Sequence, residues 1–392
     1  MMRLDRLLLI ALHESEGIGW KTINRMVLNG ELHEGLLSYD AQDWRACGLP
    51  VEKANKLAKE FPIAVERKRV ELSNDEEIEL RQEEDKVWNL TNRTKIRIIT
   101  ALDAVYPDML KSSPQAPWVL YCIGDSHLLS TPGIAMVGTR MPTGYGRKVA
   151  SMLSEALTRA GLMVVSGMAR GIDSVVHETA LRSGGPTVAV LGAGIDVIYP
   201  PENRSLYEEI AAKGLIISEY PPGTKALPGF FPQRNRIIAG LTLGTVVVEA
   251  DARSGSLITA DLALEAGRDV FSVPGPLTSP KSRGTLDLIK QGAKMVTEAG
   301  DIIEEYDSWL PKGVSDTYNK ERRAPRQERP DELAGLTNDE RQIYHMLEQG
   351  PGSLDEMIER TRWDFGHLHS VLLSLIIKKQ ITQLPGAIYK II

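Results

Sequence analysis

The sequence predicts an α/β protein with a Rossmann-like, mostly parallel sheet as its core, a helical amino-terminal domain and a carboxy-terminal winged-helix domain. The core prediction rests on short β-branched runs that alternate with amphipathic segments between residues 95 and 297. Such runs are typical of strands that are buried on both faces of a parallel sheet. The nine runs are KIRIIT, WVLYCI, IAMVG, LMVVSG, TVAVLG, LIISE, TVVVEA, DVFSVPG and AKMVT.

The chain divides into four predicted segments. Residues 1–90 show apolar residues at helical spacing and are expected to form a helical domain. Residues 91–306 hold the nine strands, and residues 307–335 are rich in charge and poor in apolar side chains, as linkers are. Residues 336–392 fit three helices followed by two short strands around Pro385-Gly386, which is the order of a winged helix.

The charge of the chain is unevenly distributed. The 392 residues carry a formal net charge of −6 at pH 7, which by itself disfavours a nucleic-acid partner. Residues 71–85, however, contain eight acidic side chains and the single base Arg81, so the rest of the chain has a net charge of +1. We interpret the acidic stretch as a solvated helix face, and the remainder is neutral enough to hold a local basic groove.

Several classes of site and location are disfavoured. No apolar run approaches the roughly 18 residues that span a bilayer, so no membrane association is expected. Cys47 and Cys122 lie far apart and form no CxxC pair, which disfavours a disulfide framework and a zinc site and fits a reducing cytoplasm. No GxxxxGK[ST] pattern occurs, so a P-loop nucleotide site is not predicted. We expect a cytoplasmic protein without metal or cofactor.

The turns that follow six of the predicted strands indicate a binding surface. In an open parallel sheet, ligands bind outside the carboxyl ends of the strands, so these turns should emerge at one edge. Glycines in them allow the main chain to approach a ligand closely, and each precedes or opens a helix whose free N–H groups attract phosphate. These glycines are Gly138, Gly167, Gly171, Gly192, Gly194 and Gly255.

Other side chains in the same turns suit a single-stranded nucleic acid. Ser254 and Ser256 add hydroxyl groups at the start of a predicted helix. The basic residues that surround the edge are Arg140, Arg147, Lys148, Arg170, Arg234, Arg236 and Arg253. The aromatic residues whose rings can stack on bases are Tyr145, Tyr199, Tyr220, Phe230 and Phe231. Together they predict a phosphate cradle with stacking faces.

A purely structural interpretation stays open for each of these features. The glycines fit the tight turns of any α/β fold, and Asp173 fits a residue that structures its loop. Glu249 and Asp251 are candidate acids or bases, but no histidine, serine or thiol is spaced to complete a triad. His177 fits a core or helix-capping residue, because no second histidine follows at metalloprotease spacing.

Six consecutive sequence blocks resemble the signature of one family. They are SGMARGIDSVVHETAL, VAVLGAGIDVIYPPENRSLYEEI, SEYPPG, FPQRNRIIAGL, VVVEADARSGSLITADLALEAGRDVFSVPG and LIKQGAK, in order across most of residues 130–296. On these blocks the chain is similar to the DNA-processing protein A (DprA/Smf) family. Longer members of that family have an amino-terminal domain like a SAM or helix-hairpin-helix unit and a carboxy-terminal winged helix, so the resemblance implies both here.

The resemblance implies a function without catalytic turnover. It implies that the chain binds and protects incoming single-stranded DNA during natural transformation, forms a homodimer through the Rossmann-like domain and helps to load the RecA recombinase. The family has Gly-Thr-Asn where this chain has Gly284-Thr285-Leu286, which puts a polar contact there in doubt. The DNA-binding residues that the resemblance and the turns indicate are Gly138, Thr139, Arg140, Gly167, Arg170, Gly171, Arg234, Asn235, Arg236, Arg253, Ser254, Gly255 and Ser256.

Two other functions stay open at this point. The first is a nucleotide phosphoribohydrolase-like enzyme, although the comparable turn at Glu249–Asp251 lacks the PGG that such enzymes have. The second is an adaptor that acts through residues 353–379 of the winged helix, whose predicted recognition helix is mostly apolar towards its end. The turn Gly17–Gly19 with Lys21 fits either a helix-hairpin-helix phosphate contact or a plain helical turn.

Overall fold

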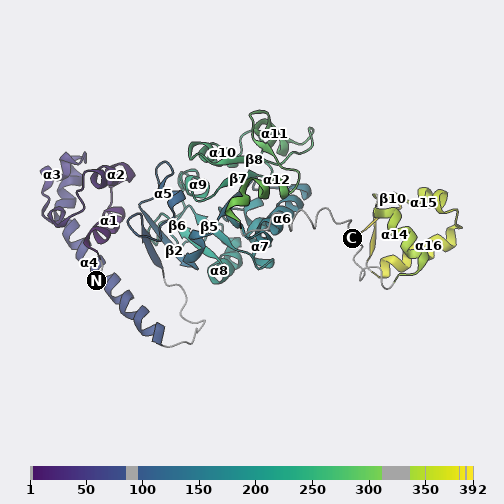
Figure 1. Ribbon diagram of the computed structural model, residues 1–392, viewed down its shortest axis with the longest axis horizontal. Coiled ribbons are helices and arrows are strands. Elements are labelled where there is room, and N and C mark those ends of the chain that lie inside the picture. The colour runs from purple at the N-terminus through teal and green to yellow at the C-terminus, as the bar shows by residue number, and fades with distance from the viewer. Residues whose placement is uncertain are drawn as a thin grey trace. The chain divides into compact units, whose positions relative to one another are not determined.

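The computed structural model (Figure 1) describes residues 3–84, 96–310, 336–348, 350–378, 380–384 and 386–391, with no side chains described from 73 to 84. The chain forms two compact units, Met1–Asn319 and Lys320–Ile392. Most of the predicted linker 307–335 and the far end of the predicted acidic stretch lie outside the described residues. The boundaries of the four predicted segments stay predictions.

A nine-stranded sheet forms the centre of the first unit, and each strand falls on one of the nine predicted runs. The strand order is β1-β2-β6-β5-β4-β3-β7-β8-β9. The seven strands from β6 to β9 in this order run parallel, whereas β1 and β2 are antiparallel additions at one edge. The strands are β1 (Arg97–Thr100), β2 (Val119–Gly124), β3 (Gly133–Val137), β4 (Met163–Ser166), β5 (Thr187–Leu191), β6 (Leu215–Ser218), β7 (Gly244–Val247), β8 (Asp269–Ser272) and β9 (Lys294–Met295).

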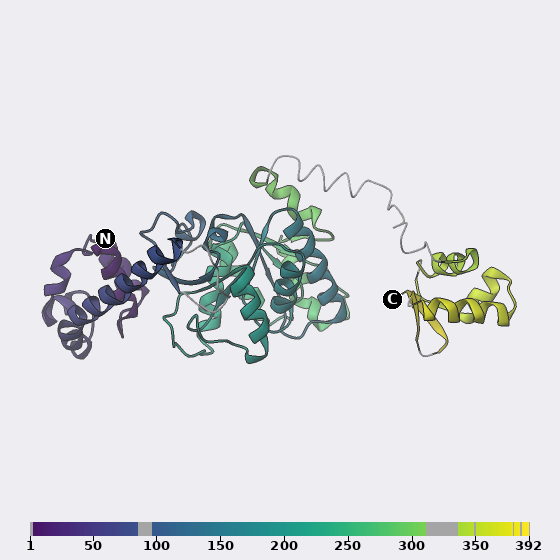
Figure 2. The ribbon, with the colours of Figure 1, turned by 90° about the horizontal axis from the view of Figure 1, so that it is seen from below.

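Helices cover both faces of this sheet (Figures 1 and 2). On β3, Ile134 and Met136 pack into the core beneath α6 and α7, while Ala135 and Val137 pack into the core beneath α9 and α10. Alternation of this kind follows from the two-residue period of a strand. The helices are α5 (Asp108–Lys111), α6 (Gly144–Arg159), α7 (Ile172–Arg182), α8 (Arg204–Lys213), α9 (Phe230–Gly240), α10 (Gly255–Glu265), α11 (Arg283–Lys290) and α12 (Gly300–Ile303), with short 3-10 turns η2 (Ser126–Ser130), η3 (Pro201–Asn203), η4 (Pro280–Ser282) and η5 (Glu304–Trp309).

The strand order reverses between β3 and β7. The chain moves outward from β3 through β4, β5 and β6, and then returns to the other side of β3 with β7 and β8. Turns that leave β3 and β7 therefore diverge, which opens the crevice where doubly wound sheets bind ligands. Across this point the N–H of Thr139 donates to the carbonyl of Glu249 at 2.8 Å.

The amino-terminal helices pack against the antiparallel edge of the sheet. Their core, centred on Trp44 and Phe61, is continuous with Val119 and Tyr121 of β2 and with Ile216 of β6. The amino-terminal part is therefore joined to the sheet by apolar contacts. It consists of α1 (Leu4–Glu14), α2 (Trp20–Leu28), η1 (Glu34–Ser38), α3 (Ala41–Ala46) and α4 (Val51–Glu84).

The second unit is a winged helix. Its elements are α14 (Asn338–Glu348), β10 (Gly352–Ser353), α15 (Leu354–Thr361), α16 (Phe365–Ile377), β11 (Ile381–Leu384) and β12 (Ile388–Ile391), with strand order β10-β12-β11. The three helices and the two final strands confirm the prediction, and β10 adds a two-residue strand. The carboxylate of buried Glu340 ties α14 to α16 by accepting hydrogen bonds from Ser374 Oγ at 2.6 Å and Lys378 Nζ at 2.7 Å. Pro385 of the predicted turn lies outside the described residues.

Candidate nucleic-acid interface

The turns after the parallel strands emerge at one edge, as predicted, and we call the face that they form the strand-end surface. Two of these turns touch. A Cβ on Gly171, where φ is +84°, would lie 2.4 Å from the carbonyl oxygen of Thr139 and 2.7 Å from the carbonyl carbon of Arg140. Glycine is therefore required here both by the backbone conformation and by the neighbouring turn. This contact places Arg140 and Arg170 on adjoining loops.

The loop between β4 and α7 is held in one conformation by several hydrogen bonds. Buried Met168 has a φ of +55°, which is uncommon for a residue with a side chain. The carboxylate of Asp173 accepts two backbone N–H groups of the loop, at 3.2 and 3.3 Å, and Asn203 Nδ2 donates to the carbonyl of Met168 at 2.9 Å. An uncommon backbone conformation such as that of Met168 persists only where several surrounding contacts hold it, and such conformations cluster at functional sites. Asp173 is thus a loop-structuring residue, as one interpretation of the sequence held.

Arg140 is the exposed arginine of the first turn. Its guanidinium carbon lies 5.8 Å from the centre of the Phe231 ring, so the charge sits over an aromatic face. Within the described residues no carboxylate forms an ion pair with Arg140. The charge is therefore available to an anion from solvent.

Arg170 and Arg253 are also exposed, but their surroundings differ. Arg170 Nε donates to the carboxylate of Glu202 on η3, and this hydrogen bond raises the pKa of Arg170 and lowers the pKa of Glu202. Arg253 precedes α10, where Ser254 caps the helix by accepting the N–H of Ser256 at 3.4 Å. Gly255 is open to solvent, whereas Ser256 is buried and its Oγ lies 2.7 Å from Ser254 Oγ.

Arg234 lies inside the protein, although the sequence placed it among the arginines around the edge. Its guanidinium donates to the carbonyl of Gly167 at 2.7 Å and to the carbonyl of Val190. A Cβ on Gly167 would lie 2.4 Å from Arg234 Nη2, so that glycine makes room for the arginine. Burial lowers the pKa of Arg234 to about 10. Burial also disfavours the charged form of Asp173 and so raises its pKa, and the charge of Arg234 opposes that rise.

The other two residues of this RNR segment also make internal contacts. Arg236 Nη2 forms an ion pair with Glu219 Oε1 at 2.6 Å, and the side chains are only 15% and 13% exposed. Asn235 accepts a hydrogen bond from Arg234 Nε at 3.3 Å. The whole segment therefore supports the ends of β4, β5 and β6 from within.

Two aromatic pairs lie on the strand-end surface. Tyr199 and Phe231 have ring centroids 5.2 Å apart, and Tyr220 stacks on Phe230 with centroids 4.2 Å apart and planes inclined by 21°. Gly192 precedes η3 without opening it. A Cβ there would lie 2.9 Å from Phe231 Cδ1, so the glycine makes room for the ring.

Two further predicted positions, Tyr145 and Gly194, have partners within the protein. Tyr145 lies across the reversal point, where its hydroxyl donates to the carbonyl of Pro274 at 2.6 Å. Gly194 also precedes η3, and its N–H donates to the carbonyl of Thr224 at 2.8 Å in a loop-to-loop contact. Arg147 and Lys148 are exposed in the first turns of α6.

One cation on this surface was missed by sequence reasoning. Lys281 Nζ lies 3.5 Å from Thr139 Oγ1, and the carbonyl of Lys281 accepts the N–H of Ala250 at 2.9 Å. Lys281 therefore lies beside the first turn, on the far side of the reversal point. Its run PKSRG carries no motif, and only the fold of η4 back onto β7 brings it there.

The candidate acid–base residues are engaged in structural contacts. Both oxygens of the buried Glu249 carboxylate accept hydrogen bonds from Thr143, from its N–H at 2.9 Å and from its hydroxyl at 2.6 Å. His177 is buried with its Nδ1 2.7 Å from Thr187 Oγ1, and burial lowers its pKa to about 3. A core role for His177 is thus confirmed. Among the described residues no cluster of His, Cys, Asp and Glu is arranged to hold a metal ion.

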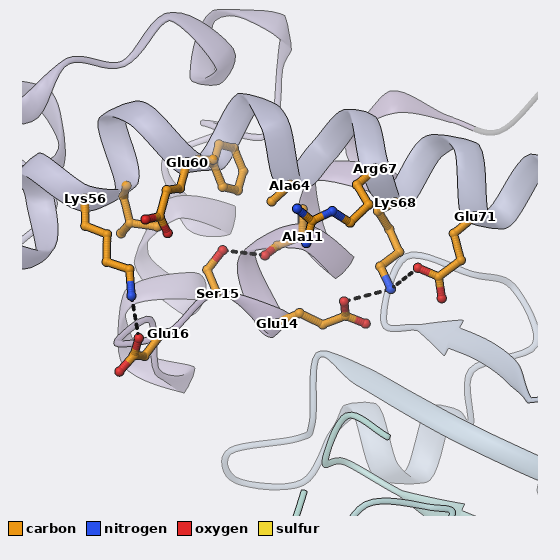
Figure 3. Close-up of a pocket in the computed structure, with 12 residues that line it drawn as sticks. Ala11, Glu14, Ser15, Glu16, Lys56, Glu60, Ala64, Arg67, Lys68 and Glu71 are labelled. Carbon is orange, nitrogen blue, oxygen red and sulfur yellow. Dashed lines mark hydrogen bonds and ion pairs between the residues drawn. The ribbon is translucent and has the colours of Figure 1, made fainter. Parts of the chain in front are cut away.

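A pocket of about 340 Å³ lies between α1 and α4 (Figure 3). Charged side chains of both signs cross it. Lys56 pairs with Glu16 at 2.7 Å, and Lys68 pairs with Glu14 and Glu71, each at 2.8 Å. None of the predicted site residues lines this pocket.

Comparison with protein-family models decides the family. A model described as DNA recombination-mediator protein A matches residues 97–307, more than half of the chain. The chain belongs to the DNA recombination-mediator protein A family. A second model, described as the DprA winged helix domain, matches residues 327–387 and agrees with the fold of the second unit. The predicted resemblance and the predicted fold class are confirmed, while the likeness of residues 1–90 to a SAM or helix-hairpin-helix unit stays a prediction.

Individual relatives agree with membership of the DNA recombination-mediator protein A family. DNA processing protein DprA of Bacillus subtilis is 47% identical over 201 residues, which cover 51% of this chain and 68% of the relative. Protein Smf of Synechocystis is 32% identical over 320 residues, which cover 75% and 80%.

Two solved structures show how far the fold is shared. The X-ray structure of DNA processing protein A from Streptococcus pneumoniae matches with a TM-score of 0.61 and 34% identity over 78% of this chain and 99% of that chain. DNA processing protein A from Helicobacter pylori, whose structure is described as giving insights into a unique single-stranded DNA binding mode, matches with a TM-score of 0.50 and 32% identity over 56% and 99%. Among the described helices of this family member, none has both the length and the apolar character that a membrane crossing needs.

Proposed function

We propose that the chain binds single-stranded DNA on the strand-end surface, with Arg140 as the main phosphate contact and Phe231 as a stacking face. The observation that carries the proposal is the exposed guanidinium of Arg140 over the Phe231 ring, on a turn that is packed against the rigid β4–α7 loop. A cation and an aromatic face side by side can bind a phosphate and an adjacent base.

A preference for single strands follows from the aromatic pairs. Tyr199 and Phe231 can stack on a base only when that base has left a duplex. Arg253 and Lys281 extend the positive charge across the reversal point, where further phosphates of the same strand would lie. The related Helicobacter pylori protein binds single-stranded DNA according to the description of its structure, which supports the same ligand here.

In this proposal the chain acts as a recombination mediator in the cytoplasm. It protects incoming single-stranded DNA during natural transformation, forms a homodimer and helps to load RecA, with neither a cofactor nor a catalytic turnover. The description of the matched family as recombination mediators supports the general role. The structure gives no support to hydrolysis at Glu249, because Thr143 engages both oxygens of that carboxylate.

The test is fluorescence anisotropy of a labelled oligothymidine at two salt concentrations, beside a duplex of equal length. We expect tighter binding of the single strand by the wild type and weaker binding by Arg140→Ala. Arg159→Ala is the matched control. Arg159 is an exposed arginine in the last turn of α6, at the end of the sheet where the parallel strands begin. Equal binding of duplex and single strand, or equal loss in both variants, would contradict the proposal.

A further inference from the structure

The amino-terminal helices contact the strand-end surface directly. β2 runs antiparallel to β6, with Tyr121 opposite Ser218, so the residues before β2 lie at the same edge as the turn after β6. Trp20 Nε1 donates to the carbonyl of Ala116 at 2.7 Å in that segment before β2. His13, at the end of α1, places Nε2 2.7 Å from the carbonyl oxygen of Glu219 in the turn after β6.

Glu219 also forms an ion pair with a residue of α9. Its carboxylate pairs with Arg236 of α9 at 2.6 Å, and both side chains are mostly buried. The next residue, Tyr220, stacks on Phe230 in the first turn of α9. One short turn therefore receives a hydrogen bond from the amino-terminal helices, an ion pair from α9 and a stacked ring from the start of α9.

α1 is itself firmly attached to the sheet. Tyr121 Oη of β2 donates to Glu14 Oε1 at 2.8 Å, and the same carboxylate pairs with Lys68 of α4 at 2.8 Å (Figure 3). Arg6, at the other end of α1, donates to the carbonyl of Ile98 at 2.6 Å. The end of α1 that carries His13 therefore has a defined position beside the turn.

We propose that the amino-terminal helices are a positioning element of the single-strand site. His13 and the Glu219–Arg236 pair hold the turn that sets Tyr220 against Phe230, and they thereby set how well bases stack there. The inference rests on the proposed function of the strand-end surface. It makes Arg236 a positioning residue that contacts no phosphate.

The experiment separates stacking on bases from contact with phosphates. Full-length protein is titrated into oligothymidine and into a tetrahydrofuran abasic oligonucleotide of equal length, at several salt concentrations. Loss of one stacked base weakens binding by roughly 5- to 150-fold, and His13→Ala loosens the rings without removing them, so we expect a loss of oligothymidine affinity near the lower end, roughly 5-fold. Binding of the abasic strand and the salt slope should not change. His13→Gln, whose amide can donate to the same carbonyl, should restore most of the affinity.

A control variant and a double variant test whether the effect is specific to His13 and whether Arg236 contacts a phosphate. His127→Ala removes an exposed histidine of η2 and should leave both affinities unchanged. Glu219→Gln combined with Arg236→Gln removes both charges and keeps polar groups in place, so we expect an unchanged salt slope. A slope reduced by about 0.7 would show that Arg236 contacts a phosphate and would overturn the inference.

Other binding results distinguish a failure of this inference from a failure of the proposed function. Equal loss of oligothymidine and abasic binding in His13→Ala, or no loss in either, would overturn the positioning role while leaving the proposed function intact. Failure of the wild type to bind oligothymidine would overturn the proposed function and, with it, this inference. Thermal unfolding of each variant shows whether a loss of binding comes from a loss of fold.

Discussion

Two arginine-bearing segments are both predicted from the sequence to bind DNA, and they differ in structure. Arg140, in the turn after β3, is exposed over an aromatic ring. Arg234, in α9, is 4% exposed and donates to the carbonyls of Gly167 and Val190. An arginine close to a phosphate-binding turn can therefore either bind the ligand or stabilise the fold. Burial and the available acceptors decide between the two.

The scaffold arginine belongs to a buried polar group. Asp173 accepts N–H groups of the β4–α7 loop while lying in the field of Arg234, and the charge of Arg234 also contributes to the low pKa of His177. This buried group fixes the loop that adjoins Arg140. Substitutions in the scaffold should therefore lower stability, whereas substitutions of the ligand-binding groups should lower affinity.

The largest effect is expected for Arg234→Ala. The substitution removes the donor for two carbonyls and leaves Asp173 buried without its opposing charge, which costs about 3–5 kcal/mol of unfolding free energy. Urea denaturation followed by circular dichroism measures it, with Arg140→Ala as the exposed control. A change below about 1 kcal/mol would mean that the guanidinium is dispensable inside the protein and the contrast is wrong.

Acid should destabilise the folded protein through His177, which belongs to the same buried group. The pKa of His177 in the folded protein is about 3, below the ordinary value of 6.5, so the unfolded chain takes up a proton that the folded chain excludes. This contribution to stability is lost as the pH falls from about 6.5 to about 3, at roughly 1.4 kcal/mol per pH unit. His177→Asn lacks the titrating ring and should flatten the dependence. Identical pH profiles for both proteins would exclude His177 as the cause.

Arg140→Ala should act on binding alone. We expect about a tenfold loss of affinity for oligothymidine, the amount that a charge-assisted hydrogen bond contributes. The salt slope should fall by about 0.7 because one phosphate contact is removed. The free energy of unfolding should stay within about 0.5 kcal/mol of the wild type, as for other exposed positions. A large loss of stability would place Arg140 with the scaffold.

The smallest effect is expected for Glu202→Gln. In the free protein Glu202 engages Arg170, and both side chains are exposed, so the carboxylate competes with a phosphate for the same guanidinium. Removing its charge should raise the affinity for single-stranded DNA roughly twofold, in line with the weakness of exposed ion pairs. The increase should disappear in Arg170→Ala. A decrease would show that the pair itself forms part of the binding surface.

Two residues of the proposed site had no signal in the sequence. Lys281 reaches Thr139 only because η4 folds back onto β7, and His13 reaches Glu219 only because α1 packs beside β2. Each pair is separated by more than a hundred residues, and neither Lys281 nor His13 lies in a recognisable motif. Contacts of this kind depend on how elements pack, which periodicity and spacing do not encode.

The nine strands, the edge where their turns meet and the winged-helix order were predictable from the sequence alone. These features depend on local period, β-branched composition and the rule that parallel strands end at one edge. Which arginines face solvent became visible only in the folded chain, because the acceptors that hold Arg234 come from β4 and β5 and the partner of Arg236 comes from the turn after β6. The direction of an arginine side chain is set by carbonyls and carboxylates that packing brings from elsewhere in the chain, so it emerges only when the whole fold is assembled.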